Sequence, residues 1–339
     1  MNFSAGQMNL HFFASQVRYE TIFSEIKKLL ARDGIPLILL KGPHLAHAVY
    51  DHPQERLYGD LDILVKPRDF RRAAGILAAN RFSLVGMDER SPATFFQTNH
   101  WIFRARTGQF IELHRGFAGL GRHRVDLDAW FGRAETFQYG LTAAQGLSSE
   151  DLLCHLCLHI GKGFFYLIEP KHIMDLDRIV RRRTIDWDAF VTRCREARAC
   201  TIAFYCLSAA SARYGTPVPP DVQMALRPGR WRRSWLDRHL DVGKFPVYRF
   251  HRREVGHARR RLTLPLLDGV SSWIPFIARA MAVKGVDILS RIPLMRRWCR
   301  RRFSLSRFGS GDEHETKTGG DPRRPDLSGE EKAGRNNED

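Results

Sequence analysis

The sequence predicts an α/β (α+β) fold that is followed by a helical subdomain. Up to about residue 145, segments with the alternating apolar pattern of strands are interspersed with segments in which apolar residues recur at helical spacing. From Ser149 onward the apolar period stays helical as far as the proline-rich stretch 217–220. The change of period therefore separates a mixed α/β unit from a helical one.

The α/β unit begins with a helix. Residues 14–32 place large apolar side chains near helical spacing, and Asp33-Gly34 follows as a C-terminal stop. A buried strand at 36–40 leads into a glycine turn at Lys41-Gly42, and Pro43 is expected at the first position of the next helix. The other elements expected in this unit are helices at 43–50 and 69–80 and strands at 59–65, 82–85, 100–106 and 109–114, of which the last two form a hairpin with a glycine turn.

The helical unit opens at Ser149. This serine is expected to cap a helix that carries Glu150 and Asp151 in its first turn, where acidic side chains favour the helix dipole. Gly161 and Gly163 are expected to end this helix. Further helices are predicted at 170–182, 186–197 and 199–213.

Two aspartates one residue apart are the most informative feature of the chain. Side chains on a strand alternate between faces, so Asp60 and Asp62 share one face of the strand at 59–65. The later strand at 110–114 offers a third carboxylate, Glu112, which shares one face of that strand with the other alternate residues. Carboxylate oxygens are the ligands that divalent metal ions such as Mg²⁺ prefer. The pattern therefore predicts a metal site on the sheet.

The order of a glycine turn, an Asp-x-Asp strand and a later strand acid resembles the DNA polymerase β-like nucleotidyltransferase superfamily. More narrowly, Leu40-Lys41-Gly42, Arg56 ahead of Gly59-Asp-Leu-Asp-Ile-Leu-Val65, and Ile111-Glu-Leu-His114 are similar to the bacterial family usually described as uncharacterised nucleotidyltransferases. The resemblance covers about residues 20–215. It implies a polymerase β-like core with a mixed sheet.

The resemblance also implies a reaction. A nucleoside monophosphate is transferred from a nucleoside triphosphate to a hydroxyl or phosphate acceptor. No residue of the chain indicates which base is bound, and AMP from ATP is expected because of the cellular supply of ATP. Asp60, Asp62 and Glu112 are implied to be catalytic and to hold Mg²⁺ or Mn²⁺, with Glu112 as the base. The superfamily usually has Gly-Gly or Gly-Ser at the turn, and here Lys41 is expected to supply charge instead. The residues assigned to substrate binding are Lys41, Gly42, Arg56, His114, His159 and Lys162.

The chain divides into four expected parts. They are a nucleotidyltransferase catalytic core at 1–145, a helical subdomain at 146–220, a basic and mostly helical extension at 221–305, and a polar tail at 306–339 that is expected to be disordered. The formal net charge of +17 and the pI near 10.1 favour polyanionic partners. Within the extension, 231–261 is a candidate for nucleic-acid binding, and 273–303 is a candidate for contact with an anionic membrane surface.

Composition also predicts a cytoplasmic protein. The chain shows no secretion signal at its start and no apolar run long enough for a transmembrane segment. Its six cysteines lack the spacing of a disulfide framework, so reduced thiols are expected. His155 and His159 stand four residues apart with Cys154 and Cys157 interleaved, but no second spaced pair follows. A buried helix face is therefore favoured over a zinc site.

Three alternatives to a nucleotidyltransferase acting on a small molecule, peptide or protein remain open. A glycosyltransferase also uses Asp-x-Asp to bind metal, although only about 60 residues precede the motif here. A non-catalytic nucleotide- or nucleic-acid-binding protein of the same fold is favoured by the altered glycine turn. A polynucleotide-modifying transferase would use the basic C-terminal half. The sequence leaves the acceptor, the nucleotide preference and the oligomeric state undetermined.

Overall fold

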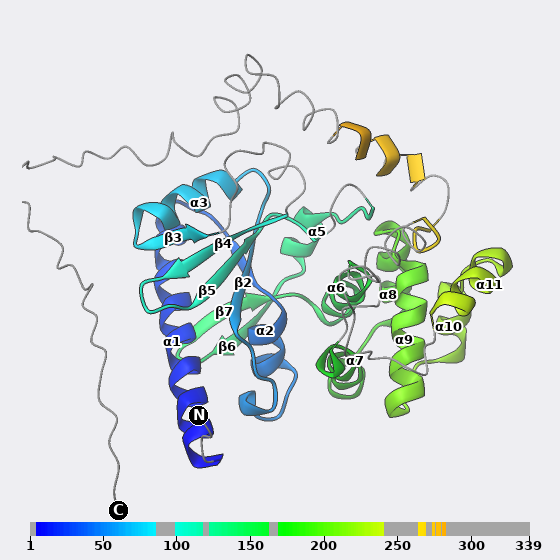
Figure 1. Ribbon diagram of the computed structural model, residues 1–339, viewed down its shortest axis with the longest axis horizontal. Coiled ribbons are helices and arrows are strands. Elements are labelled where there is room, and N and C mark those ends of the chain that lie inside the picture. Colours follow the sequence, from blue (N-terminus) through cyan, green and yellow to red (C-terminus); the bar gives the residue numbers. More distant parts are fainter. Residues whose placement is uncertain are drawn as a thin grey trace, which may run out of the picture. The chain divides into compact units, whose positions relative to one another are not determined.

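The computed structural model describes most of the α/β and helical units (Figure 1). The described residues belong to a compact unit that spans Met1–Gly309. The expected disordered tail and most of the basic extension lie outside the described residues. None of the described helices has the length and apolar character that a membrane span requires. The described residues are 5–85, with side chains from Phe13, and 99–117, 122–162, 169–240, 264–268, 273–274, 276–278 and 280–282.

Five strands form one mixed sheet in the α/β unit (Figure 1). They are β1 (Leu37–Leu39), β2 (Asp60–Val65), β3 (Phe82–Val85), β4 (His100–Ala105) and β5 (Phe110–His114). Their order across the sheet is β1-β2-β5-β4-β3. Strands β2 and β5 are parallel, whereas the other neighbouring pairs are antiparallel. The mixed sheet and the β4–β5 hairpin confirm the expected fold class.

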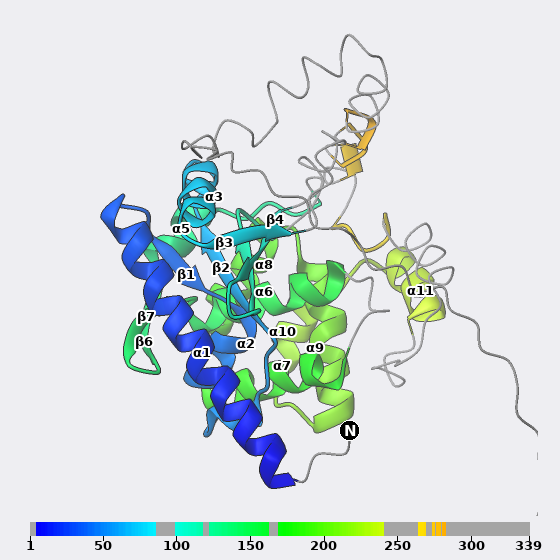
Figure 2. The same ribbon diagram turned by 60° about the vertical axis from the view of Figure 1, so that its left-hand side comes forward.

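One face of the sheet packs against α1 (Ala5–Arg32) and α3 (Phe70–Ala79). Alternation along β2 directs Leu61, Ile63 and Val65 into this core, and all three are fully buried. Figure 2 shows α1 lying across the sheet on this side, with α6 and α9 behind it. Burial of this apolar row fixes the register of β2, because a slip by one residue would carry the row to the other face.

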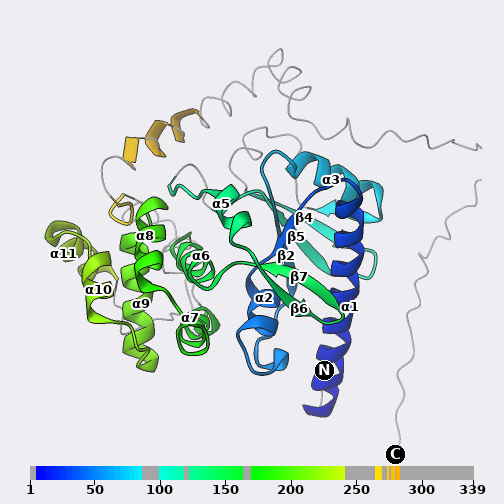
Figure 3. The same ribbon diagram turned by 180° about the vertical axis from the view of Figure 1, so that it is seen from behind.

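The opposite face of the sheet packs against the helical subdomain. Ile38 of β1 and Leu64 of β2 belong to the same hydrophobic core as the helices of that subdomain. Figure 3 shows these helices beside the sheet from behind. The predicted helices are confirmed, and further helices follow the proline-rich stretch. The helices are α6 (Ser149–Lys162), α7 (Pro170–Arg182), α8 (Trp187–Glu196), α9 (Cys200–Tyr214), α10 (Pro220–Leu226) and α11 (Arg230–His239).

The ends of α6 differ from the sequence-based expectation. The cap is Ser148 and not Ser149, because the Ser148 hydroxyl accepts a hydrogen bond at 3.5 Å from the backbone N–H three residues later. Gly161 lies inside the helix and does not end it. A Cβ at this position would lie 2.5 Å from Cδ1 of Ile202, so the glycine allows α6 and α9 to approach closely. The other expected stop, Gly163, lies outside the described residues.

Two helices near the N-terminus also begin earlier than expected. Helix α1 begins at Ala5, well before residue 14, where apolar spacing first indicates it. Helix α2 (Lys41–Ala48) begins at Lys41, so Pro43 occupies its third position and not its first. At the first and at the third position of a helix the backbone N–H has no intrahelical partner, which is why proline is tolerated at either position.

A short helix and a hairpin between the sheet and α6 were not predicted. The helix is α5 (Leu127–Gly132), and the hairpin joins β6 (Glu135–Tyr139) to β7 (Thr142–Gly146). In β6 only Tyr139 is fully buried, and Leu141 at the turn is completely exposed. The strand therefore lacks the regular apolar alternation from which a half-buried strand is recognised.

His44 of α2 is a buried histidine beneath this hairpin. Its ring lies 4.8 Å from the ring of Phe137, centroid to centroid, and a Cβ at Gly146 would lie 2.3 Å from His44 Nε2. Burial, and then the positive charge of Arg183, lowers the pKa of His44 to about 3. The imidazole is therefore neutral in the folded protein at neutral pH.

We expect His44 to make stability depend on pH. Its folded pKa lies below its ordinary value of 6.5, so the unfolded state binds the proton more tightly, and stability falls as the pH drops below about 6.5. Between pH 7 and pH 5 this loss amounts to about 2 kcal/mol. Urea denaturation of His44→Leu at both pH values is expected to show a correspondingly smaller loss than the wild type. The exposed His52→Leu variant is the control, and equal losses in all three proteins would contradict the assignment.

Candidate active site

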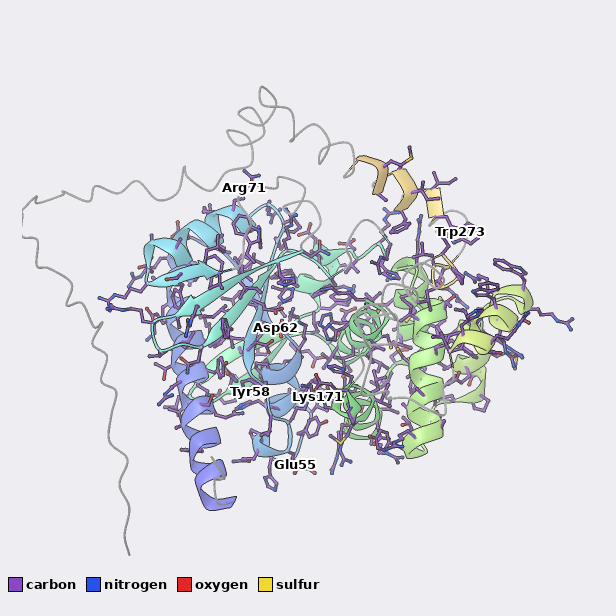
Figure 4. All side chains as sticks on the ribbon, in the orientation of Figure 1. Glu55, Tyr58, Asp62, Arg71, Lys171 and Trp273 are labelled. Carbon is purple, nitrogen blue, oxygen red and sulfur yellow. The ribbon has the colours of Figure 1, made fainter. Side chains whose placement is uncertain are left out.

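The three predicted acids lie together because β2 and β5 are adjacent, parallel and in register. Asp62 pairs with Glu112 across the two strands, and Asp60 lies two residues earlier than Asp62 on the same face. Asp62 is only 1% exposed, whereas the Glu112 side chain is 22% exposed. Figure 4 labels Asp62 on the side of the sheet that faces the helical subdomain. The register of two strands thus converts a distant sequence pattern into one acidic cluster.

Two basic side chains contact the buried carboxylate of Asp62. Lys41 Nζ donates a hydrogen bond to Asp62 Oδ1 at 2.5 Å and lies 3.6 Å from Glu112 Oε2. His114 Nε2 lies 2.7 Å from the same Asp62 Oδ1 and 3.2 Å from Glu112 Oε2. Lys41 comes from the start of α2, and His114 is the last residue of β5. Asp62 therefore lies at the centre of a network of polar side chains from three elements.

Burial and charge affect the three acids differently. Burial, followed by the charges of Asp62 and Glu112, raises the pKa of Asp60 to about 6. Burial also favours the neutral form of Asp62, but Lys41 and His114 outweigh it and hold the pKa of Asp62 well below its usual range. At Glu112 burial is outweighed by the hydrogen bond with His114 and by the charge of Lys41, so its pKa is lowered. Asp60 is the acid whose charge is least compensated.

The first two residues of α2 combine an unusual backbone with close packing. Lys41 has a φ of 47°, in the left-handed region that residues other than glycine rarely adopt. A Cβ at Gly42 would lie 2.5 Å from the Cβ of Tyr58, so only glycine lets the turn approach the segment before β2. This packing accounts for Gly42 without a ligand. Its role in substrate binding stays a prediction.

His100 is a site residue that the sequence analysis missed. It begins β4 directly opposite His114, and the centroids of the two rings lie 5.0 Å apart. Its Nε2 lies 4.0 Å from Glu112 Oε2. Burial, and then the charge of His114, lowers the pKa of His100 to about 4. The observed turn holds three residues, 106–108, because Ala105 pairs with Gln109, and this register gives the His100–His114 pairing. A two-residue turn at 107–108 would instead place His100 opposite Arg115, so the pairing depends on the turn length.

The end of α6 brings two further predicted residues near the cluster. Burial lowers the pKa of His159 to about 3 and also lowers the pKa of Lys162, and in both cases the charge of Lys41 is the next largest cause. Such an effect requires proximity to Lys41. Contact of His159 and Lys162 with a nucleotide stays a prediction. Cys154 and Cys157 of the same helix are free thiols in the hydrophobic core.

Arg56 makes contacts that differ from the expected phosphate contact. Its Nε and Nη2 donate hydrogen bonds to the two carboxylate oxygens of Asp175 on α7, at 2.7 and 2.9 Å, and both residues are buried. Nη1 donates to the carbonyl oxygen of Leu57, and the Tyr50 hydroxyl donates to Asp175 Oδ1 at 2.8 Å. The bidentate pair joins the segment between η1 (Pro53–Glu55) and β2 to the helical subdomain. In this structure the guanidinium of Arg56 therefore has a structural role, because it holds the two units together.

We expect Asp175→Ala to destabilise the protein by about 3 kcal/mol, because it leaves the Arg56 guanidinium buried without its partner. Urea denaturation monitored by circular dichroism measures the loss. Replacing both charges, in Arg56→Met with Asp175→Leu, is expected to recover most of the stability, since no buried charge then remains. A double variant less stable than Asp175→Ala would contradict this interpretation.

We expect Asp60→Asn to stabilise the metal-free protein. The folded pKa of about 6 exceeds the ordinary value of 3.8, so the folded state binds more protons than the unfolded state, and stability falls as the pH rises from about 4 to 6. At pH 8 the substitution removes this cost and raises the free energy of unfolding by about 1 to 3 kcal/mol. At pH 4 the gain disappears. Denaturation in EDTA at the two pH values measures the difference, and a variant less stable at pH 8 would show that the charge of Asp60 is structural.

Comparison with known proteins places this geometry in context. A family model described as "Uncharacterised nucleotidyltransferase" matches residues 9–215. No curated protein matches the chain.

Several solved structures resemble parts of the chain. The antibiotic-resistance factor ANT(2'')-Ia is 11% identical, over 49% of this chain and 84% of its own, with a TM-score of 0.34. The lincosamide antibiotic adenylyltransferase LnuA, bound to lincomycin, is 13% identical over 47% and 94%, with a TM-score of 0.33. An antigenic nucleotidyltransferase-like protein from Paracoccidioides brasiliensis is 16% identical over 61% and 91%, with a TM-score of 0.36. At these TM-scores the likeness carries no weight, and the family match alone carries the assignment.

Proposed function

We propose, because the chain belongs to the family of uncharacterised nucleotidyltransferases, that it transfers a nucleoside monophosphate from a nucleoside triphosphate to a hydroxyl or phosphate acceptor in a metal-dependent reaction. The family makes nucleotidyl transfer the class of reaction. The observation that supports the finer proposal is the cluster of Asp60, Asp62 and Glu112 on one face of β2 and β5. ATP is the proposed donor because it is the most abundant triphosphate in the cytoplasm, where we place the reaction.

The acidic cluster fits a divalent metal ion. Its donors are carboxylate oxygens, which Mg²⁺ and Mn²⁺ prefer. The raised pKa of Asp60 has the charges of Asp62 and Glu112 among its causes, and this repulsion is what a cation relieves. Asp60, Asp62 and Glu112 would hold the ion, which supplies positive charge to the phosphate oxygens when bound.

The remaining steps belong to the protein's own side chains. An oxygen of the acceptor attacks the α-phosphorus, the bond from that phosphorus to its bridging oxygen breaks, and pyrophosphate leaves. Glu112, which is more exposed than Asp62, accepts the proton of an attacking hydroxyl. His114 lies within hydrogen-bond distance of both Asp62 and Glu112 and orients the two carboxylates. A phosphate acceptor that is already ionised needs no base.

The groups proposed to bind the triphosphate come from the start of α2 and the end of α6. Lys41 supplies charge, and Gly42 lies in the first turn of α2, where backbone N–H groups are free for an anion. His159 and Lys162 are proposed to contact the nucleotide from α6, because the charge of Lys41 contributes to lowering the pKa of both residues. Arg56 is left out of this set, because its guanidinium is bound to Asp175.

One observation favours a second candidate, a non-catalytic nucleotide-binding protein of the same fold. Lys41 Nζ lies 2.5 Å from Asp62 and 3.6 Å from Glu112, so one ammonium group already lies within ion-pair distance of two of the three acids. A protein in which this ion pair persisted would bind a triphosphate without acting on it. The two candidates differ in whether pyrophosphate is released.

We expect labelled nucleotide to appear on an acceptor when the protein is incubated with α-labelled triphosphates, Mg²⁺ or Mn²⁺, and a cell extract. Asp60→Asn is expected to reduce transfer at least about 100-fold, because it removes charge stabilisation from the transition state. This variant is expected to be more stable than the wild type, so lost transfer would not reflect unfolding. The matched control is Asp128→Asn, whose side chain is 72% exposed.

Other outcomes of the same experiment separate the candidates. Triphosphate binding without pyrophosphate release in any extract would favour the non-catalytic protein. Turnover of sugar nucleotides, with no turnover of triphosphates, would favour a glycosyltransferase. Transfer that is equal in Asp60→Asn and Asp128→Asn would contradict the acidic site itself.

A further inference from the structure

Side chains from β4 and β5 gather two imidazoles and one carboxylate at the edge of the acidic cluster. The antiparallel register places His100 directly opposite His114, and Glu112 precedes His114 by two residues on the same face. One ligand atom from each of the three lies within 4.8 Å of the other two. His100 and Glu112 each keep 22% of the side chain exposed, so the group is open to solvent.

The spacing of these atoms approaches that of ligands around one small ion. Bonds of about 2.0 to 2.2 Å place neighbouring ligand atoms of a tetrahedral ion about 3.3 to 3.6 Å apart. His114 Nε2 lies 3.2 Å from Glu112 Oε2, and His100 Nε2 lies 4.0 Å from the same oxygen. Small rotations of the side chains on rigid strands are enough to close the remaining difference.

The imidazole of His100 is also free to act as a ligand. Its Nδ1 is buried and has no hydrogen-bond partner among the described residues. No neighbour therefore fixes the tautomer, and Nε2 can carry the lone pair that a metal ion needs. His114 must exchange its contact with Asp62 for the ion, and Lys41 then remains as the cation that balances Asp62.

We propose that His100, Glu112 and His114 bind a divalent transition-metal ion, of the kind represented by Zn²⁺ and Co²⁺, in preference to Mg²⁺. Imidazole nitrogen suits these ions, whereas Mg²⁺ strongly prefers oxygen. Asp60 and Asp62 offer oxygen alone, so the two ends of the site differ in the ion that they favour. Binding of the ion does not depend on the proposed function. The effect of the ion on nucleotidyl transfer rests on the proposed function, because the bound ion engages Glu112, the proposed base, and so couples transfer to the transition metal.

Titration of the metal-stripped, full-length, tag-free protein with Co²⁺ tests the proposal through the visible ligand-field absorption of the bound ion. We expect one equivalent to bind, Zn²⁺ to displace it, and a large excess of Mg²⁺ to leave it in place. His100→Gln is expected to weaken the affinity at least about tenfold. His52→Gln, which changes an exposed histidine, is the matched control and is expected to bind Co²⁺ as the wild type does.

Two results would overturn the proposal. One is an unchanged Co²⁺ affinity in His100→Gln, with circular dichroism equal to that of the wild type. The other is loss of Co²⁺ binding in Asp60→Asn but not in His100→Gln, which would assign the ion to the aspartates. The absorption is measured on the protein alone, so failure of nucleotidyl transfer in the earlier experiment leaves this test intact.

Discussion

Compensation of the buried charge on Asp62 is the constraint on which the site depends. The register of β2 and β5 buries this carboxylate beside Glu112, and an isolated charge at such a position would be strongly unfavourable. Lys41 and His114 supply the compensation from two different elements. Burial of one acid therefore connects the start of α2 to the end of β5. Among the described residues no side chain compensates Asp60 to the same extent, and its pKa is raised, which makes it the acid most responsive to an added cation.

A second buried pair connects the site to the helical subdomain. Arg56 and Asp175 join the segment before β2 to α7, and Tyr50 adds a hydrogen bond to the same carboxylate. Sheet residues on the acidic face also share a hydrophobic core with α6 to α9. The helical subdomain is therefore part of the site's wall, and its position relative to the acids is fixed by both apolar and ionic contacts. This arrangement explains why the charge of Lys41 is among the causes that lower the pKa values of His159 and Lys162 of α6.

The sequence predicted the structure correctly where a feature depends on the residue pattern within a single strand or helix. Alternation within β2 predicts that Asp60 and Asp62 share a face opposite Leu61, and helical spacing predicts α6 to α9. It failed where partners come from distant segments. The pairing of Arg56 with Asp175 depends on tertiary packing that no local pattern encodes, and β6 buries only Tyr139 and so lacks a period. His100 lies between these cases, because hairpin register predicts its position opposite His114 once the turn is known.

The ion pair of Lys41 explains why a lysine occupies a left-handed backbone conformation at this position. A lysine at a φ of 47° costs of order 1 to 3 kcal/mol of strain, which glycine would avoid. Glycine would also leave Asp62 with His114 alone as its compensating group, so the ion pair offsets the strain. The ammonium group lies within 3.6 Å of both Asp62 and Glu112, two of the carboxylates that are proposed to hold the ion. On the proposed function, an ion that binds the acids displaces Lys41, and its charge becomes available to phosphates at the first turn of α2. The same side chain then balances carboxylates in the metal-free protein and phosphates in the loaded one.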